Sequence, residues 1–209
     1  MKTRVKICGI TREQDLLFCI QAGIDFAGFI FHPESRRYIR PEQVGALKGM
    51  EGGRVGVFVR HSLEEIKEAV DAARLDFIQL HGAQDTEFCR ALPADKIIKV
   101  FWPEKYPSPE ELQKDMRLFA PLCRYLLLDA GQGGGGHGRR IKTPYPEERD
   151  LLGRTFIAGG LGPDNIKQVL NQSPFAVDIS SGVEKSPGIK DQTLVLELIR
   201  KVRTKKGLD

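Results

Sequence analysis

Short hydrophobic runs recur along the chain, and most have the length and the β-branched or aromatic content that is typical of a β-strand. The stretches between these runs have the spacing of polar and apolar residues that is typical of helices. Eight runs are predicted to be strands: Val5–Cys8, Phe26–Phe31, Val55–Val59, Phe77–Leu80, Ile97–Phe101, Tyr125–Asp129, Thr155–Ala158 and Ala176–Ile179. The pattern therefore predicts eight β–α units in succession.

Several of the intervening stretches begin with residues that favour a helix start. The pattern Ser/Thr-x-x-Glu/Gln, in which two side chains cap the first turn, occurs at Thr11–Gln14, Ser62–Glu65 and Ser108–Glu111. Another start is predicted at Gly162–Asn165, with its proline at the first helical position. A last helix is expected to begin near Asp191.

The alternation of strands and helices predicts an α/β fold with a parallel sheet. Parallel strands need crossover connections of one hand, so the chain winds in one direction around the sheet. An open doubly wound sheet accommodates about six strands comfortably. Eight strands in 209 residues fit a compact (β/α)8 TIM barrel better. No stretch has the composition of a linker, so we expect a single domain over residues 1–209.

The composition, with 41% hydrophobic and 29% charged residues, is that of a soluble globular protein. No run approaches the ~18 apolar residues of a membrane helix and no signal-peptide core is present, so we expect a cytoplasmic protein with no membrane partner. The net charge of +4 is mild, and the basic run 201–206 is interpreted as a solvated last helical turn, where the helix dipole favours cations; a nucleic-acid arm is the less frequent alternative, and no nucleic-acid partner is expected. Four cysteines are widely spread without metal-ligand spacing, which predicts reduced thiols and no metal: Cys8, Cys19, Cys89 and Cys123.

Polar residues at the ends of the predicted strands are candidate functional groups, because the active site of a (β/α)8 barrel lies at the carboxyl ends of its strands. Asp129 ends an almost wholly apolar run, where a charge is costly unless it is paired or used. A glycine-rich segment follows it, which favours a functional role over a helix or turn cap. Cys8 ends the first run, where a cysteine is either a small core residue or a chemical group.

The loops after the second and fourth predicted strands carry further candidates. Arg36 and Arg37 follow the second strand, where a guanidinium can bind a carboxylate with two hydrogen bonds; either one is equally readily an exposed arginine. Gln79 and His81 place an amide and an imidazole at the end of the fourth strand. Both are candidates for substrate binding, although His81 is as readily a structural histidine.

Glycine-rich turns follow the seventh and eighth predicted strands. The first contains Gly159 and Gly160, and the second contains Ser180, Ser181 and Gly182. Glycines let a backbone approach a ligand closely, and N–H groups at helix starts attract anions. Barrels often bind phosphate between these two loops, so the pair predicts a phosphate site. The residues alone thus describe a barrel for a small phosphorylated molecule, with a thiol and a carboxyl group facing each other as base and acid.

Seven motifs follow one another across nearly the whole chain: Lys6–Thr11, Ser35–Tyr38, Val55–Phe58, Gln79–Gly82, Leu127–Asp129, Ala158–Leu161 and Val177–Glu184. Together they closely resemble the phosphoribosylanthranilate isomerase family. The first and last motifs are specific to that family among phosphate-binding barrels.

The resemblance implies an Amadori rearrangement in tryptophan biosynthesis, without metal or organic cofactor. N-(5-phosphoribosyl)anthranilate becomes 1-(2-carboxyphenylamino)-1-deoxyribulose 5-phosphate. By the family pattern, Asp129 matches the general acid that opens the sugar ring, and Cys8 matches the general base that takes the proton from C2. Arg37 matches the arginine at the anthranilate carboxylate, and Asp178 falls near the amino group. The glycine-rich turns match the phosphate cradle.

The proposed chemistry sets a condition on each of the two groups. Cys8 acts as a thiolate, and nearby positive charge is expected to raise the thiolate fraction. Asp129 must begin as the protonated acid, which burial favours by raising the pKa of a carboxyl group.

One loop departs from the family pattern. After the sixth strand the family usually has Gly-Gly-Thr-Gly, two variable residues and then Phe-Asp-Trp. Here the corresponding residues are Gly135–Gly138 and, after two arginines, Ile141–Thr143. The loop is a candidate lid over the substrate, so we expect activity with altered substrate affinity.

Two alternatives stay open. The first is an isomerase of a histidine-pathway aminoaldose on the same barrel, which pairs two aspartates and binds two phosphates; Cys8 argues against it. The second is a ligand-binding barrel without catalysis, against which the presence of both Cys8 and Asp129 argues. The pattern does not distinguish a monomer from a homodimer.

Overall fold

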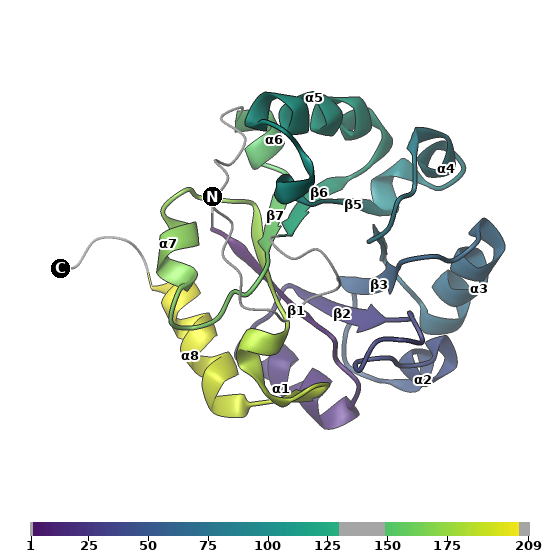
Figure 1. The fold of residues 1–209 in the computed structure, drawn as a ribbon. Coiled ribbons are helices and arrows are strands. Elements are labelled where there is room, and N and C mark those ends of the chain that lie inside the picture. Colours follow the sequence, from purple (N-terminus) through teal and green to yellow (C-terminus); the bar gives the residue numbers. More distant parts are fainter. Residues whose placement is uncertain (1, 130–148, 205–209) are drawn as a thin grey trace.

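The computed structural model describes residues 2–129 and 149–204 and contains a closed barrel of eight parallel strands, in the order β1 to β8. Figure 1 shows the strands at the centre of the molecule and the helices around them. The strands are β1 Arg4–Cys8, β2 Phe26–Ile30, β3 Arg54–Phe58, β4 Phe77–Leu80, β5 Ile97–Phe101, β6 Tyr125–Asp129, β7 Thr155–Ala158 and β8 Ala176–Ile179. All eight agree with the predicted strands to within one residue, and the predicted (β/α)8 fold is confirmed.

Helices follow the strands and cover the outside of the barrel (Figure 1). They are α1 Glu13–Ala22, α2 Pro41–Ala46, α3 Leu63–Ala73, α4 Thr86–Arg90, α5 Pro109–Phe119, α6 Arg149–Leu152, α7 Ile166–Leu170 and α8 Gln192–Arg203. Within the described residues, no helix is both long and apolar enough to cross a membrane.

The strands separate two hydrophobic clusters, because successive side chains on a strand point to opposite faces. Val5 and Ile7 of β1 pack outward in the cluster beneath the helices, together with most of the core. Phe26 and Phe156 belong to a second cluster inside the barrel. The same alternation turns Lys6 and Cys8, the other two positions of β1, toward the barrel interior.

Two of the predicted helix starts are confirmed in detail. The Ser62 hydroxyl accepts a hydrogen bond from the Glu65 N–H, and the Glu65 carboxylate accepts one from the Ser62 N–H. Ser108 accepts a hydrogen bond from the N–H of Glu111 in the same way, ahead of α5. The start near Asp191 is also confirmed, since its carboxylate caps α8 by accepting hydrogen bonds from the next turn.

At the two other predicted starts the expected caps do not form, because distant or neighbouring groups take the capping side chains. Helix α1 begins at Glu13 without a side-chain cap, and the Thr11 hydroxyl instead donates to the carbonyl of Gly188 at 2.7 Å. Helix α7 begins at Ile166, beyond the expected proline start. The Asn165 amide there closes a turn by bonding Gly162 N and Gly160 O, which delays the helix.

The chain after β8 forms additional short elements before α8. They are a single 3-10 turn, η4 Ser181–Val183, and a small antiparallel pair, β9 Glu184–Ser186 and β10 Ile189–Lys190. This excursion places Glu184 and Lys190 beside the carboxyl ends of β1 and β8. All four cysteines are free thiols, as expected.

Candidate active site

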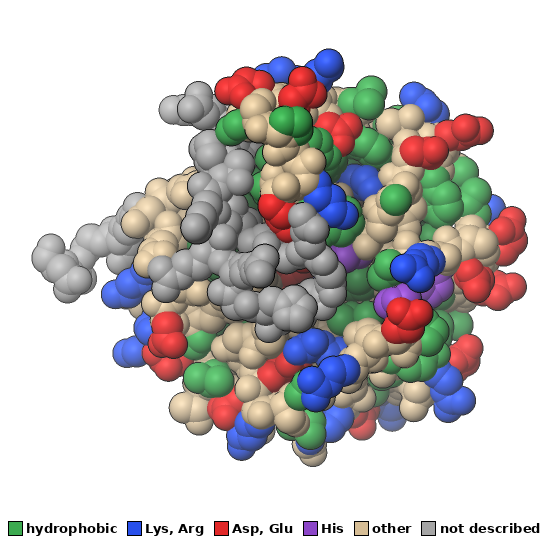
Figure 2. Space-filling view, viewed as in Figure 1, with side chains coloured by type: hydrophobic (Ala, Val, Ile, Leu, Met, Phe, Trp, Pro, Cys, Tyr) green, Lys and Arg blue, Asp and Glu red, His purple; other side chains and the backbone are tan. Residues whose placement is uncertain are grey.

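A cavity of about 720 Å³ lies at the carboxyl ends of the strands. Figure 2 shows acidic, basic and histidine side chains around the middle of the face that this view presents. Ten of the eleven predicted site residues line the cavity: Cys8, Arg37, Gln79, His81, Asp129, Gly159, Gly160, Asp178, Ser180 and Ser181. The barrel thus brings together side chains from strands that are far apart in the sequence.

Gly182 is the predicted site residue that does not line the cavity. A Cβ atom at this position would lie 2.0 Å from the Leu161 carbonyl oxygen, so the residue packs the two glycine-rich turns against each other. The turn after β7 has left-handed backbone at Gly159 and Gly160, with φ of 98° and 62°. The helical segments that follow the two turns are short, since α7 has five residues and η4 has three.

Cys8 ends β1, is only 7% exposed and lines the cavity. Burial raises the pKa of the Cys8 thiol above its ordinary value, while the Lys6 ammonium acts in the opposite direction. The positive charge expected near this thiol is therefore present, but desolvation outweighs it. The thiolate is the minor form at neutral pH and, as the conjugate of a weak acid, a strong base.

Asp129 ends β6 and is 4% exposed, facing His81. The Gln79 amide nitrogen, which can only donate, lies 3.2 Å from His81 Nδ1, so the neutral imidazole carries its proton on Nε2. That nitrogen lies 3.5 Å from Asp129 Oδ2. Burial, with Lys6 and two more lysines nearby, lowers the pKa of His81 to about 4. The imidazole is thus uncharged at neutral pH.

Arg37 lies at the rim of the cavity, in the segment between β2 and α2. Its Nη2 and Nε donate to the Glu184 carboxylate at distances from 2.6 to 3.1 Å. Gly9 makes room for this arginine, because it is left-handed and a Cβ there would lie 2.5 Å from Arg37 Cδ. Burial alone would raise the pKa of Glu184, but Arg37 and Lys190 bring it below its ordinary value.

Several buried polar atoms at the cavity have no hydrogen-bond partner within the part of the chain that the structure describes. They are Gln79 Oε1, His81 Nε2 and Asp178 Oδ1. Unsatisfied buried polar atoms are rare and costly in native proteins. Because these atoms lie at one cavity, they indicate that a polar ligand supplies the missing hydrogen bonds.

Sequence reasoning missed three charged residues that organise the cavity: Lys6, Glu184 and Lys190. Lys190 Nζ donates to Glu184 and to the Cys8 carbonyl oxygen, at 2.7 and 2.6 Å. Lys6 carried a local signal, because a lysine stands inside an otherwise apolar strand, two residues before Cys8. For Glu184 and Lys190, the contacts to Arg37 and Cys8 were not predictable locally, because they span 147 and 182 positions of sequence.

In the described ranges, no three His, Cys, Asp or Glu side chains are grouped so that they could hold a metal ion. The loop that departs from the family pattern, Gly135–Thr143, lies outside the described residues.

The closed barrel and its cavity at the carboxyl ends of the strands, lined by a thiol and a carboxyl group, are the features of a TIM-barrel enzyme. The model of the N-(5'-phosphoribosyl)anthranilate isomerase family matches residues 5–201. The chain belongs to this family and is an aldose–ketose isomerase of tryptophan biosynthesis.

Individual relatives agree with this assignment. The chain is 42% identical over 193 residues to the isomerase of Maridesulfovibrio salexigens, covering 92% of this chain and 94% of the relative. The crystal structure of the Thermotoga maritima isomerase has a TM-score of 0.84 at 34% identity, covering 96% and 98% of the two chains. Another structure, with a TM-score of 0.77 at 32% identity and the same coverage, is an isomerase complex with reduced 1-(o-carboxyphenylamino)-1-deoxyribulose 5-phosphate.

Proposed function

We propose that this chain converts N-(5'-phosphoribosyl)anthranilate into 1-(2-carboxyphenylamino)-1-deoxyribulose 5-phosphate, with Asp129 as general acid and Cys8 as general base. The observation that carries the proposal is the convergence of these two side chains, from β6 and β1, on one cavity. They are buried at 4% and 7% exposure, so bulk water has little access to either. The complex of a similar isomerase with a reduced product supports a phosphorylated ligand of this class.

Asp129 begins the reaction by giving its proton to the ring oxygen of the sugar. The bond between that oxygen and C1 breaks, and the nitrogen lone pair forms an iminium with C1. Neutral His81 supports this role, because a cation 3.5 Å away would favour the ionised carboxylate. This role requires that the carboxyl group of Asp129 is protonated when the substrate binds.

Cys8 acts in the second step as a thiolate and takes the proton from C2 of the sugar. The electrons of that bond form an enolamine and neutralise the iminium. Loss of the C2 hydroxyl proton and protonation at C1 then give the ketone product. The iminium acidifies the C2 proton, and general acid–base catalysis contributes roughly 10²–10⁴-fold for each group.

Substrate binding uses the remaining groups of the cavity. Arg37 binds the anthranilate carboxylate through its Nη1 edge, which Glu184 does not use. Asp178 Oδ1 accepts a hydrogen bond from the amino group. The Gln79 Oε1 and His81 Nε2 atoms, which have no partner among the described residues, form hydrogen bonds with the sugar.

The phosphate of the substrate lies between the turns after β7 and β8. The left-handed backbone at Gly159 and Gly160, and the Ser180 and Ser181 segment, supply N–H groups at the cavity wall. Gly182 contributes by allowing the two turns to pack closely.

Assembly as a monomer or homodimer and a cytoplasmic location stay predictions. A structure at 32% identity is described as monomers generated from a dimeric Thermotoga maritima isomerase. Sedimentation of the purified chain measures its oligomeric state directly.

The test follows the loss of anthranilate-type fluorescence as phosphoribosylanthranilate, generated in place, is consumed. Wild type is compared with Cys8→Ser, Asp129→Asn and the matched control Cys19→Ser, whose thiol is buried beneath the helices. We expect turnover in wild type and in the control, with collapse in the two site variants. Full turnover in Cys8→Ser contradicts the role of the base, and full turnover in Asp129→Asn contradicts that of the acid.

A further inference from the structure

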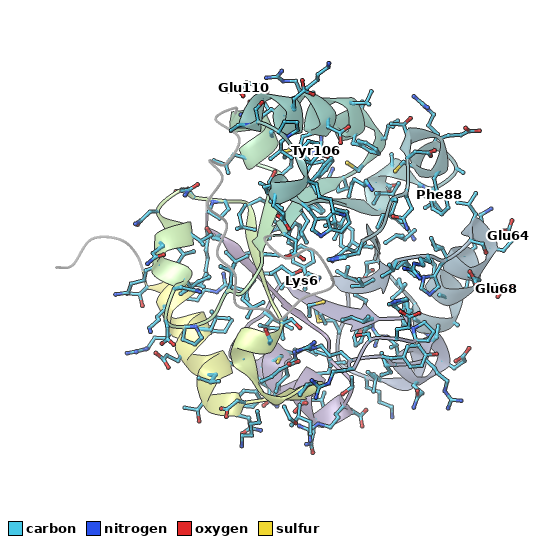
Figure 3. All side chains as sticks on the ribbon, viewed as in Figure 1. Lys6, Glu64, Glu68, Phe88, Tyr106 and Glu110 are labelled. Atoms are coloured by element: carbon cyan, nitrogen blue, oxygen red, sulfur yellow. The ribbon has the colours of Figure 1, made fainter. Side chains whose placement is uncertain are left out.

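Lys6 lies inside the barrel, where a charged side chain is costly. Its exposure is 0%, and Figure 3 places it within the ring of strands, unlike the labelled Glu64 and Glu68 on the outer helix α3. The strand register sets Lys6 directly opposite Asp178 of β8. Their side chains form an ion pair, with 2.9 Å between Nζ and Oδ2. Burying a lysine in this way requires a compensating partner, and Asp178 is the first one.

The Cys8 thiol is the second partner of this ammonium. Gly28 of β2 lies opposite Cys8 in the strand register. Because glycine has no side chain, it leaves space for the Cys8 thiol and the Lys6 ammonium. A Cβ atom at Gly28 would lie 2.8 Å from Cys8 Sγ and 2.9 Å from Lys6 Nζ. The sulfur and the ammonium nitrogen are thus no further apart than the sum of these distances, within the range of a strong electrostatic interaction.

The ammonium is also held in its charged form. Burial alone would lower the pKa of Lys6, but Asp178 and Cys8 raise it above its ordinary value. Among the described residues, the other charged groups that act on the thiol are Asp178 on β8, Lys190 on β10 and Arg37 in the β2–α2 segment. Lys190 bonds the Cys8 carbonyl and pairs with Glu184, and Arg37 pairs with Glu184 as well. Of these cations, Lys6 has the strongest effect on the thiol.

We propose that Lys6 is a positioning residue of the isomerase site, whose ammonium stabilises the thiolate of Cys8 and holds Asp178 with one carboxylate oxygen free for the substrate. The inference rests on the proposed role of Cys8 as the base. Asp178 Oδ2 is bound by Lys6, whereas its buried Oδ1 has no partner among the described residues. One cation therefore serves both the base and a group that contacts the substrate.

The first experiment titrates the Cys8 thiol without turnover. The ultraviolet absorbance of the thiolate is followed against pH, and the signal of Cys8→Ser is subtracted so that only Cys8 contributes. We expect Lys6→Met to decrease the thiolate fraction about tenfold or more at a given pH, the effect of losing one nearby cation. Asp178→Asn should shift the titration the other way, because Asp178 disfavours the thiolate. Lys99→Met is the matched control, a buried lysine of β5 that bonds the Gly82 carbonyl instead.

The second experiment measures the pH dependence of kcat and kcat/KM for the same variants. In Lys6→Met, the fold decrease in kcat should be larger than the fold increase in KM. The pH at which kcat/KM rises should shift by the same amount as the midpoint of the thiol titration. An unchanged thiol titration in Lys6→Met overturns the inference, whatever happens to the activity. A shifted thiol titration together with full turnover in Cys8→Ser supports the electrostatic link and overturns the role of the base instead.

A variant that removes both charges distinguishes a folding defect from the loss of the electrostatic effect on the thiol. Lys6→Met leaves Asp178 buried without its cation, which is destabilising. Lys6→Met/Asp178→Asn leaves no buried charge, and its thiol titration is compared with that of Asp178→Asn alone. We expect the double variant to have the smaller thiolate fraction of the two. Equal fractions contradict the inference.

Discussion

Glu184 binds one edge of the Arg37 guanidinium with both of its carboxylate oxygens, across 147 positions of sequence. The shortest of these contacts is 2.6 Å, and Lys190 approaches the same carboxylate at 2.7 Å. The carboxylate therefore orients the arginine that we assign to the substrate. It is coupled through Lys190 to the backbone of the Cys8 base.

Removing the charge of Glu184 should weaken substrate binding more than it slows the chemical step. In Glu184→Gln, Arg37 loses charge-assisted hydrogen bonds that contribute about 1.5–3 kcal/mol, so we expect KM to rise roughly tenfold to a hundredfold with a smaller change in kcat. Steady-state kinetics measure both constants. Glu197→Gln, which removes the carboxylate partner of Lys201 on α8 and lies outside the cavity, is the control and should leave both constants unchanged. An unchanged KM in Glu184→Gln contradicts the orienting role.

A methyl group at Gly28 should disturb the base without unfolding the barrel. In Gly28→Ala the new Cβ meets the thiol of Cys8 and the ammonium of Lys6 below 3.0 Å, so both must shift. Misplacement of about 1 Å in an active site can lower activity about a hundredfold, and we expect a fall in kcat of this order. Gly52→Ala is the contrasting variant. Its new Cβ atom would contact no other atom, but the backbone φ of 78° is strained for alanine. The substitution should therefore lower stability and leave kcat unchanged. Wild-type kcat in Gly28→Ala would count against the packing argument.

Arg54 should be one of the main stabilising residues outside the active site. It is 6% exposed and donates to the carbonyl oxygens of Val44, Leu47, Met50 and Ala73, which joins the ends of α2 and α3 to β3.

In Arg54→Met these buried acceptors lose their donor, which should lower the free energy of unfolding by on the order of 3 kcal/mol. Urea unfolding measures the change. The control Arg60→Met replaces an exposed arginine and should stay within about 0.5 kcal/mol of wild type. An equal effect of the two substitutions contradicts the assignment.

In the folded protein, His81 should stay neutral at pH values well below the ordinary pKa of histidine. Its pKa is lowered to about 4, mainly by burial, whereas in the unfolded chain it is about 6.5. As the pH falls from 6.5 to 4, the unfolded state gains a proton that the native state does not bind, and stability decreases. Integrated over this range, the loss is about 3 kcal/mol.

NMR titration of the imidazole measures the native pKa of His81 directly. Urea unfolding at pH 7 and pH 4.5 measures the linked stability, and His81→Gln should lose less stability over this interval than wild type. Protonation of the native imidazole between pH 6 and 7 would show that the site is more solvated than its burial indicates.

The hydrophobic pattern of the sequence was sufficient to predict all eight strands and the barrel, because strand period and crossover handedness are local or generic properties. The same pattern placed Cys8 and Asp129 at strand ends, and barrel closure turns every strand end toward one cavity. The capping box of Ser62 and Glu65 was equally predictable, because both partners lie within one helical turn.

Only the tertiary structure decided which distant groups meet. The hydroxyl of Thr11 bonds Gly188, 177 positions away, and so does not cap the helix that its motif predicted. Lys6 meets Asp178 across 172 positions, and this contact exists only because β1 pairs with β8 when the barrel closes. Local sequence specifies the period and the ends of each element, whereas the charge environment of the thiol is set by the register of strands at the closure of the sheet.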